Sequence, residues 1–198
     1  MPDDPAPRTA ARFRSGSATL PPPAEAPDAA AAPRAVPRGA DPLDALYERP
    51  GFKLRRAHQI SLSVFAEECR AHDVTNTQFG VLTALRHRPG LDQVGLSQVL
   101  GLDRSTTGMV VGLLERRGLL RRDQPSTDRR RRVLALTPAG EELLDTLAPA
   151  AERARQRLLA PLTAAEEATL HALLDRVLSH HDAAVRVPLR RGEPAAED

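Results

Sequence analysis

Apolar residues recur at helical spacing along most of the chain after residue 42, and Pro or Gly interrupts each run. The first run covers about residues 44–72, with a break near Pro50 and Gly51, and it predicts a long, partly buried helix. Its main apolar positions are Leu54, Ile60, Leu62, Val64 and Phe65. A second helix is expected in TNTQFGVLTALRHRPG, because Thr75 and Gln78 have the spacing of a capping box and a Pro-Gly pair ends the pattern.

Two short helical patterns follow in DQVGLSQVLGLDRSTTGMVVGLLERRG, separated by Gly101 and Leu102. Asp103 is a suitable N-cap for the second of them. Leu96, Leu100 and Val110 are apolar, and the glycine falls where the chain must turn. This spacing is similar to that of a DNA-binding helix-turn-helix, whose second helix enters the major groove. On these residues alone, a plain helical hairpin remains an alternative.

A β-hairpin is predicted directly after the second of these helices. Leu119 and Leu120 begin an extended stretch, residues 123–128 have the composition of a turn, and Val133 to Leu136 alternate like a returning strand. A hairpin in this position would form the wing of a winged helix.

Positive charge is concentrated in and before this hairpin. Residues 116–132 hold eight Arg and two Asp, or +6, so the rest of the chain carries −4 out of a total of +2. A solvated, charged turn is the simple alternative. Mutual repulsion of the arginines would oppose folding unless a polyanion neutralised them, so we expect them to meet DNA phosphates and a narrow minor groove.

Two further helices are expected after the wing. Thr137 and Pro138 begin one that runs to about Leu159, and Thr163 with Glu166 has the capping-box spacing at the start of the other. The last helix carries an apolar stripe of Leu170, Leu173, Leu174 and Val177. A small winged domain cannot bury such stripes, so a homodimer is expected, and its two-fold symmetry would require a palindromic operator.

The order of these elements resembles the MarR family of winged helix-turn-helix transcription regulators over about residues 48–182. The motifs that carry the resemblance are DRST at the start of the recognition helix, LERRGLL at its end, and Asp-x-Arg ahead of LALTPAG. The resemblance implies a mainly α fold with a small β-hairpin wing and a helical dimerisation region. It also implies that the protein is a sequence-specific DNA-binding regulator.

The resemblance assigns DNA contacts to the wing and to the recognition helix. In the wing, Asp128 would fix the hairpin and Arg130 would reach the minor groove. The candidate DNA-binding residues are Arg104, Ser105, Thr106, Gly108, Met109, Asp128, Arg129, Arg130, Arg131 and Arg132. Many members carry a cation where this chain has Met109, so direct base readout is expected to be sparse.

The stretch YERPGFKLRRAHQ, residues 47–59, is similar to the opening of family members that respond to aromatic carboxylates or their coenzyme A thioesters. The similarity implies that Arg55 pairs with the ligand carboxylate, with Arg56 as the second candidate and His58 and Gln59 as polar companions. The protein would then be a repressor that a small anionic aromatic effector releases from DNA. Alternatively, both arginines are surface charges or dimer salt bridges.

Composition bounds the remaining possibilities. Residues 1–42 are rich in Pro and Ala and predict a disordered tail, and residues 183–198 predict a C-terminal tail. Between them, residues 43–182 form the MarR-like domain, with the winged helix at about 75–137 and dimerisation helices at about 43–72 and 138–182. No long apolar run predicts a membrane span, and a single cysteine, Cys69, favours a cytoplasmic location.

No cofactor, metal site or catalytic activity is expected. The six histidines show no compact ligand spacing, and no nucleophile has a base beside it. Two other functions remain open. The chain could be a redox-responsive regulator that uses Cys69, or a winged-helix interaction module that binds protein or RNA.

Overall fold

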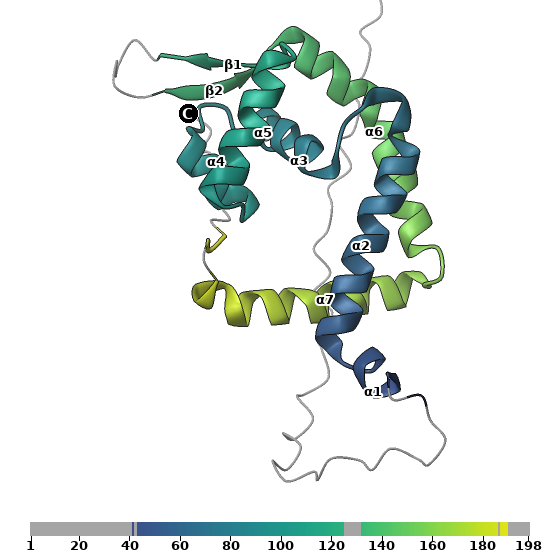
Figure 1. The fold of residues 1–198 in the computed structure, drawn as a ribbon. Helices are drawn as coiled ribbons and strands as arrows, with labels where there is room; N and C mark the ends of the chain where they lie inside the picture. The colour runs from purple at the N-terminus through teal and green to yellow at the C-terminus, as the bar shows by residue number, and fades with distance from the viewer. Residues whose placement is uncertain (1–40, 42, 125–131, 186, 190–198) are drawn as a thin grey trace, which may run out of the picture. The chain divides into compact units, whose positions relative to one another are not determined.

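The computed structural model describes residues 41, 43–124, 132–185 and 187–189. The chain divides into two units, residues 1–44 and 45–198, and the fold described here is that of the second. Its helices and strands (Figure 1) are α1 (Asp44–Tyr47), α2 (Pro50–Glu68), α3 (Asn76–His87), α4 (Gln93–Leu100), α5 (Arg104–Arg116), β1 (Leu120–Asp123), β2 (Val133–Leu136), α6 (Pro138–Leu159) and α7 (Ala164–His181), with short 3-10 turns at Arg70–His72 and Asp182–Ala184. The expected fold class, mainly α with one β-hairpin, is confirmed.

The predicted first helix is divided into parts. Pro50 occupies the first turn of α2, where its fixed backbone angle suits a helix start and its missing N–H costs nothing. At the other end, Cys69 caps α2, and Asp73 turns the chain with a φ of 49°. The predicted tail of residues 1–42 lies, apart from Asp41, outside the described residues.

Both predicted capping boxes are present. The Gln78 N–H donates to Thr75 Oγ1 (3.3 Å), and the Thr75 N–H donates to Gln78 Oε1 (3.1 Å). Thr163 and Glu166 exchange the equivalent pair of hydrogen bonds at the start of α7. Each box satisfies N–H groups that have no partner within the helix, so these two helices begin where their sequences predict.

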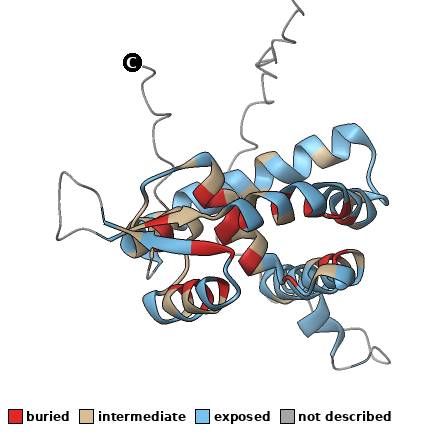
Figure 2. Cartoon of the chain, turned by 90° about the horizontal axis from the view of Figure 1, so that it is seen from above, coloured by how far each residue is buried: buried red, intermediate tan, exposed pale blue. Residues whose placement is uncertain are grey.

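The winged-helix part has its own aliphatic core. Figure 2 shows the buried residues of the whole chain in red. Gly101 joins α4 to α5 with a φ of +64°, a conformation that favours glycine. The strands of the wing are antiparallel and pair Leu120 with Leu136. The core residues come from α3, α4, α5, both strands and the loop between α5 and β1, with one from α6; they are Val81, Leu82, Ala84, Leu85, Leu96, Val110, Val111, Leu114, Leu119, Leu120, Leu134 and Leu144.

A second apolar cluster lies between α2 and α6. Its buried members are Phe65, Cys69, Val74, Leu147, Ala150 and Ala154. Phe79 of α3 packs against both clusters, and its ring centroid is 5.5 Å from that of Phe65. Cys69 is only 1% exposed, because Val74 and the α6 residues pack over it.

The base of the wing packs tightly on the start of α6. The Thr137 hydroxyl donates to the Gly118 carbonyl (2.7 Å), and the Thr137 N–H donates to the Leu119 carbonyl (3.2 Å). Gly140 lies directly against that Leu119 carbonyl, and a Cβ there would overlap its oxygen. The glycine of the TPAG motif is therefore required by a close backbone approach.

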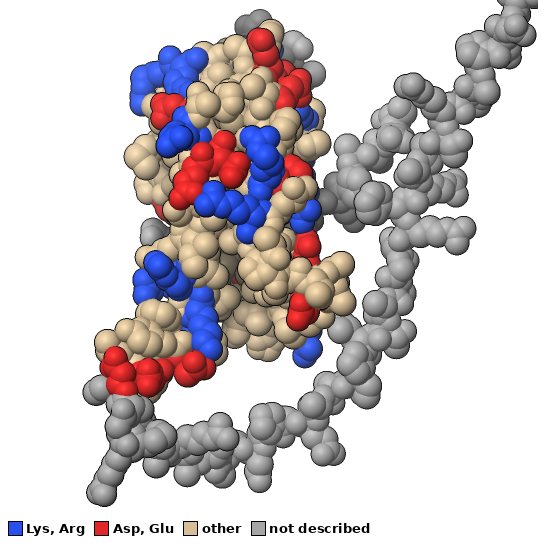
Figure 3. All heavy atoms as spheres, turned by 90° about the vertical axis from the view of Figure 1, so that its right-hand side faces the viewer, with Lys and Arg blue, Asp and Glu red and all other residues tan. Residues whose placement is uncertain are grey.

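The helices outside the winged part leave apolar side chains uncovered. On α1 and α2 these include Tyr47, Leu54, Ile60 and Leu62, while α7 exposes Leu170, Leu173, Val177 and Leu178 and has no buried residue. Basic and acidic side chains are interspersed with uncharged surface on the side shown in Figure 3. Among the described residues, no helix is both long enough and apolar enough to cross a membrane.

Candidate nucleic-acid interface and effector cleft

Helix α5 buries one face and exposes the other. Thr107, Val111 and Leu114 are fully buried, whereas Ser105 is exposed and Met109 is 68% exposed. Arg104 and Arg116 are exposed at the two ends of the helix, and Thr106 and Gly108 are half-buried between them. The candidate recognition residues are therefore together on the surface, with a cation and two hydroxyl groups in the first turn and a glycine and a methionine in the second.

Asp103 organises the first turn of α5, as its N-cap position predicts. One carboxylate oxygen accepts the Thr106 N–H (2.9 Å) and the Ser105 hydroxyl, and the other accepts the Thr106 hydroxyl (2.7 Å). The hydrogen bond from Ser105, then those from Thr106, hold the pKa of Asp103 well below its usual range. The hydroxyl hydrogens of Ser105 and Thr106 are consequently directed at the protein, which leaves only their lone pairs for a ligand.

Some of the arginines in and before the wing have partners within the fold. Arg121 pairs with Asp123 (2.8 Å) and Arg122 pairs with Glu115 (3.1 Å). Arg117 donates to the carbonyls of Asp73 (2.7 Å) and His72 (3.3 Å). Partners within the fold thus hold three of the eight arginines, although only Glu115 adds a negative charge that the net value of +6 did not already include. Sequence reasoning missed these pairs because Glu115 lies just outside the basic run and the carbonyls belong to a distant turn.

The rest of the wing is described only in part. Arg132, directly before β2, is exposed. Asp128, Arg129, Arg130 and Arg131 lie outside the described residues, so their assignment to DNA stays a prediction.

The four effector candidates are all exposed on α2. The Arg55 guanidinium lies over the Phe52 ring, 4.9 Å from its centroid, and the Phe52 ring lies 5.2 Å from that of Tyr47. Arg56 donates to Gln59 Oε1 at 3.5 Å. The first pair forms a cation–aromatic stack and the second a weak contact. Neither arginine is among the residues that line the cleft described next.

A cleft of about 220 Å³ lies further along the same helix, between α2, α3 and α6. It is lined by Ser61, Phe65, Asn76, Phe79, Ala151, Ala154, Arg155 and Leu158. Its walls are two aromatic rings and aliphatic groups, with a few polar side chains, which is the usual composition of a small-molecule site. No sequence motif marked this cleft, because its lining comes from segments that are far apart in the chain.

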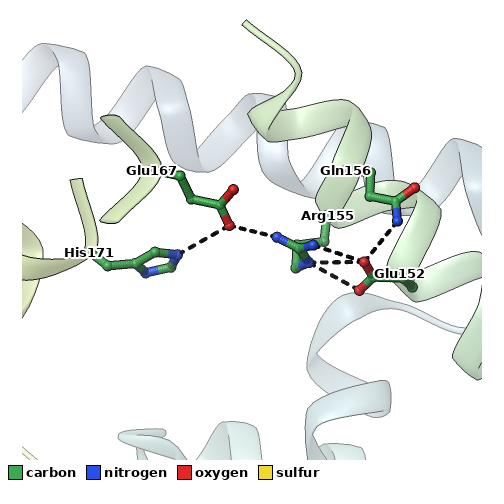
Figure 4. A network of polar contacts seen from close by, with 5 residues as sticks. All are labelled: Glu152, Arg155, Gln156, Glu167 and His171. Atoms are coloured by element: carbon green, nitrogen blue, oxygen red, sulfur yellow. Dashed lines mark hydrogen bonds and ion pairs between the residues drawn. The ribbon is translucent and has the colours of Figure 1, made fainter. Parts of the chain in front are cut away.

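Arg155, the cation of the cleft, is already neutralised (Figure 4). It donates to Glu152 (2.9 Å) on its own helix and to Glu167 (2.6 Å) on α7. His171 approaches the same Glu167 oxygen at 3.8 Å. Hydrogen bonds from Arg155 lower the pKa of Glu152, so both partners remain charged at neutral pH. The network ties α6 to α7 and leaves Arg155 little charge to offer an anion.

The environment of Cys69 is not typical of a redox-sensing thiol. Burial, followed by the neighbouring Glu68 carboxylate, raises the pKa of its thiol. Oxidants react with the thiolate, which this environment disfavours. The geometry therefore argues against redox sensing through Cys69. Among the described residues, no group of three or more His, Cys, Asp or Glu side chains is arranged to hold a metal ion.

Comparison with known proteins agrees with the geometry. The model of the MarR family matches residues 72–131, from the turn after α2 into the wing. A transcriptional regulatory protein for the hcr operon of Thauera aromatica is 38% identical over 128 residues, which cover 64% of this chain and 77% of the relative. The chain belongs to the MarR family.

Solved structures of other MarR-like regulators share the fold. The PcaV transcriptional regulator of Streptomyces coelicolor, solved with its natural ligand, is 36% identical, with a TM-score of 0.61 over 71% of this chain and 96% of PcaV. BpsR of Bordetella bronchiseptica, whose DNA binding is regulated by 6-hydroxynicotinic acid, is 31% identical, with a TM-score of 0.63 over 66% of this chain and 94% of BpsR. The MarR-family fold thus extends over most of the part of the chain that the structure describes.

Proposed function

We propose that this MarR-family protein is a homodimeric repressor that binds a palindromic operator and is released from it by a small anionic aromatic effector. The observation that carries the proposal is the exposed face of α5 directly followed by a basic hairpin, in a chain of this family. In this proposal, α5 enters the major groove and the wing arginines contact phosphates and the minor groove.

The uncovered apolar faces support the dimer. Leu54, Ile60, Leu173 and Val177 are each 42–52% exposed in one chain. A monomer would leave two helical stripes in water, whereas a second copy could cover both sets at once in a two-fold interface. Such a dimer would present two α5 helices to the two halves of a palindromic site.

The relatives and the surroundings of Arg55 support an aromatic acid as effector. PcaV binds a natural ligand, and the DNA binding of BpsR responds to a hydroxylated nicotinic acid. Among the described residues, the Arg55 guanidinium has no carboxylate partner and rests on an aromatic ring. It precedes Ser61, at the edge of the cleft, by about 9 Å along the helix axis. Because Arg155 is neutralised, Arg55 is the better candidate to pair with a ligand carboxylate.

Release from DNA requires a ligand that prefers the DNA-incompetent conformation. A ~100-fold loss of operator affinity corresponds to a coupling free energy of about 2.7 kcal/mol. A carboxylate that pairs with an arginine beside aromatic walls can give a difference in binding free energy of this size between the two conformations.

The test is a gel-shift titration on the DNA just upstream of the gene, with hydroxylated benzoates, cinnamates and their thioesters as competitors. Wild type should bind this DNA and dissociate with at least one member of the panel. Arg55→Ala should bind equally well but stay bound at effector concentrations that release wild type. Lys53→Ala is the matched control, because Lys53 is a cation of the same helix that already pairs with Glu48 (2.7 Å).

Three results would contradict parts of the proposal. A protein that binds RNA or another protein, and no operator, would be an interaction module instead. Release of Arg55→Ala at the wild-type effector concentration would remove Arg55 from the site. Calorimetry that shows no binding to any member of the panel would exclude the aromatic-acid class.

A further inference from the structure

Gln93, the first residue of α4, sends its side chain across to the recognition helix. Asp92 caps α4 by accepting the Gly95 N–H (2.7 Å), which fixes the helix start from which Gln93 projects. The Gln93 Nε2 lies 3.1 Å from the point that a Cβ on Gly108 would occupy. The carboxamide therefore fills the notch that the glycine leaves in α5. It makes no hydrogen bond to any residue that the structure describes.

Apart from the Arg104 guanidinium in the first turn, the part of α5 around this notch offers few hydrogen-bond donors of its own. The hydroxyl hydrogens of Ser105 and Thr106 are directed at Asp103. Gly108 has no side chain, and the exposed Met109 is apolar. A primary carboxamide provides two donor hydrogens and an acceptor oxygen in one plane. Gln93 thus brings to the middle of this face a carboxamide, which α5 itself does not supply.

We propose that Gln93 is a base-reading residue, which contacts an adenine in each half of the operator across the notch at Gly108. In the major groove adenine presents an acceptor at N7 and a donor at N6, the pattern that a glutamine carboxamide matches with two hydrogen bonds. A phosphate would use only the donor half of the amide. The inference rests on the proposed function, because it requires α5 to enter the major groove.

The missing side chain at Gly108 is part of the same arrangement. A glycine allows another group to approach the backbone closely, here the Gln93 amide. An alanine Cβ at this position would stand 3.1 Å from Nε2, closer than ordinary van der Waals contact. The Gly108→Ala variant should therefore push the amide aside and weaken the same base preference as removal of Gln93.

The experiment measures operator binding of wild type and Gln93→Ala against operators in which each symmetric pair of base pairs is changed in turn. Wild type should lose roughly 5- to 100-fold in affinity per half-site at one A·T position. Gln93→Ala should bind the original operator and the operator changed at that position equally well. The slope of affinity against salt should not change, because no charge is lost. Gln156→Ala, which removes the same type of side chain from α6, is the control and should keep the wild-type preference.

A second variant keeps the inference testable if Gln93→Ala is poorly folded. Gln93→Glu replaces the amide by an acceptor and should shift the preference at that position from adenine to cytosine. Uniform weakening on all operators would mean that Gln93 contacts a phosphate, and an unchanged preference would mean that it contacts no base; either result overturns the inference. Failure of wild type to bind any operator would instead refute the proposed function, on which the inference rests.

Discussion

Gly140→Ala should destabilise the fold and displace the wing. The added methyl group would overlap the carbonyl oxygen of Leu119, a backbone atom that cannot move without its neighbours. To relieve the overlap, the start of α6 must separate from the end of the loop before β1. That movement stretches the two hydrogen bonds by which Thr137 holds Gly118 and Leu119.

The size of the effect follows from these contacts. Overpacking of a tight site costs about 1–3 kcal/mol, and two weakened hydrogen bonds add about 0.5–1.5 kcal/mol each. Part of the sum is recovered because alanine has a better helix propensity than glycine, by about 1 kcal/mol. We expect a net loss of about 2–4 kcal/mol in the free energy of unfolding.

Gly51→Ala provides the matched control. It is the same substitution near the start of a helix, but apart from the adjoining residues and the helix's own backbone no described atom lies within 4 Å of the new methyl group. This variant should be neutral or more stable by up to about 1 kcal/mol. Urea denaturation compares the stability of the variants. All samples must have the same protein concentration, because the stability of a dimer depends on concentration.

The DNA-binding readout is separate from stability. Because β1 and β2 rest on this contact, Gly140→Ala should also weaken operator binding at temperatures where the variant is fully folded. Relative to wild type, amide hydrogen exchange should become faster in β1 and β2 than in α3, which would locate the structural change in the wing. If Gly140→Ala matched Gly51→Ala in stability, the close approach of Leu119 to Gly140 would not constrain the fold.

Further predictions concern the interface and the tails. Arg130→Ala should weaken operator binding by roughly 1–3 kcal/mol with dimer and fold intact, as measured by gel shift and size exclusion; equal affinity would remove it from the minor groove. Arg132→Ala should lower affinity on all sequences and reduce the salt slope by about one unit, which a salt titration measures. Truncation after Leu159 removes α7 and should abolish the soluble dimer, whereas deletion of residues 1–40 should leave the melting temperature nearly unchanged; light scattering and calorimetry check both. The lowered pKa of Asp103 implies that its stabilising contribution is complete above the usual aspartate pKa and is lost only as pH falls through the lower folded-state value. The difference in the free energy of unfolding between wild type and Asp103→Asn should therefore stay constant from neutral pH down to about pH 5, and a change in that range would contradict the hydrogen bonding described for Asp103.

Local sequence signals determined where the elements begin and end. Thr75 with Gln78, and Thr163 with Glu166, cap their helices within one turn, and Asp103 caps α5 in the same way. These signals are reliable because they act between residues three or four positions apart, where the chain's own geometry brings the groups together. The family resemblance likewise rests on short motifs around the recognition helix and the wing, and the comparisons confirm it.

Tertiary structure decided what depends on contacts between distant segments. The pairing of Arg122 with Glu115, the full burial of Cys69 and the approach of Leu119 to Gly140 have no local signature. The same holds for the cleft at Arg155, whose walls come from three helices.

Gln93 illustrates the difference most directly. In the sequence it is an ordinary polar residue at a helix start, fifteen positions before Gly108. Only the crossing of α4 over α5 brings its amide into the space that the glycine leaves. The sequence by itself determined which helices form, because capping and periodicity are local. Which side chains share a surface was decided by packing, because that depends on how the apolar faces of separate helices are buried together.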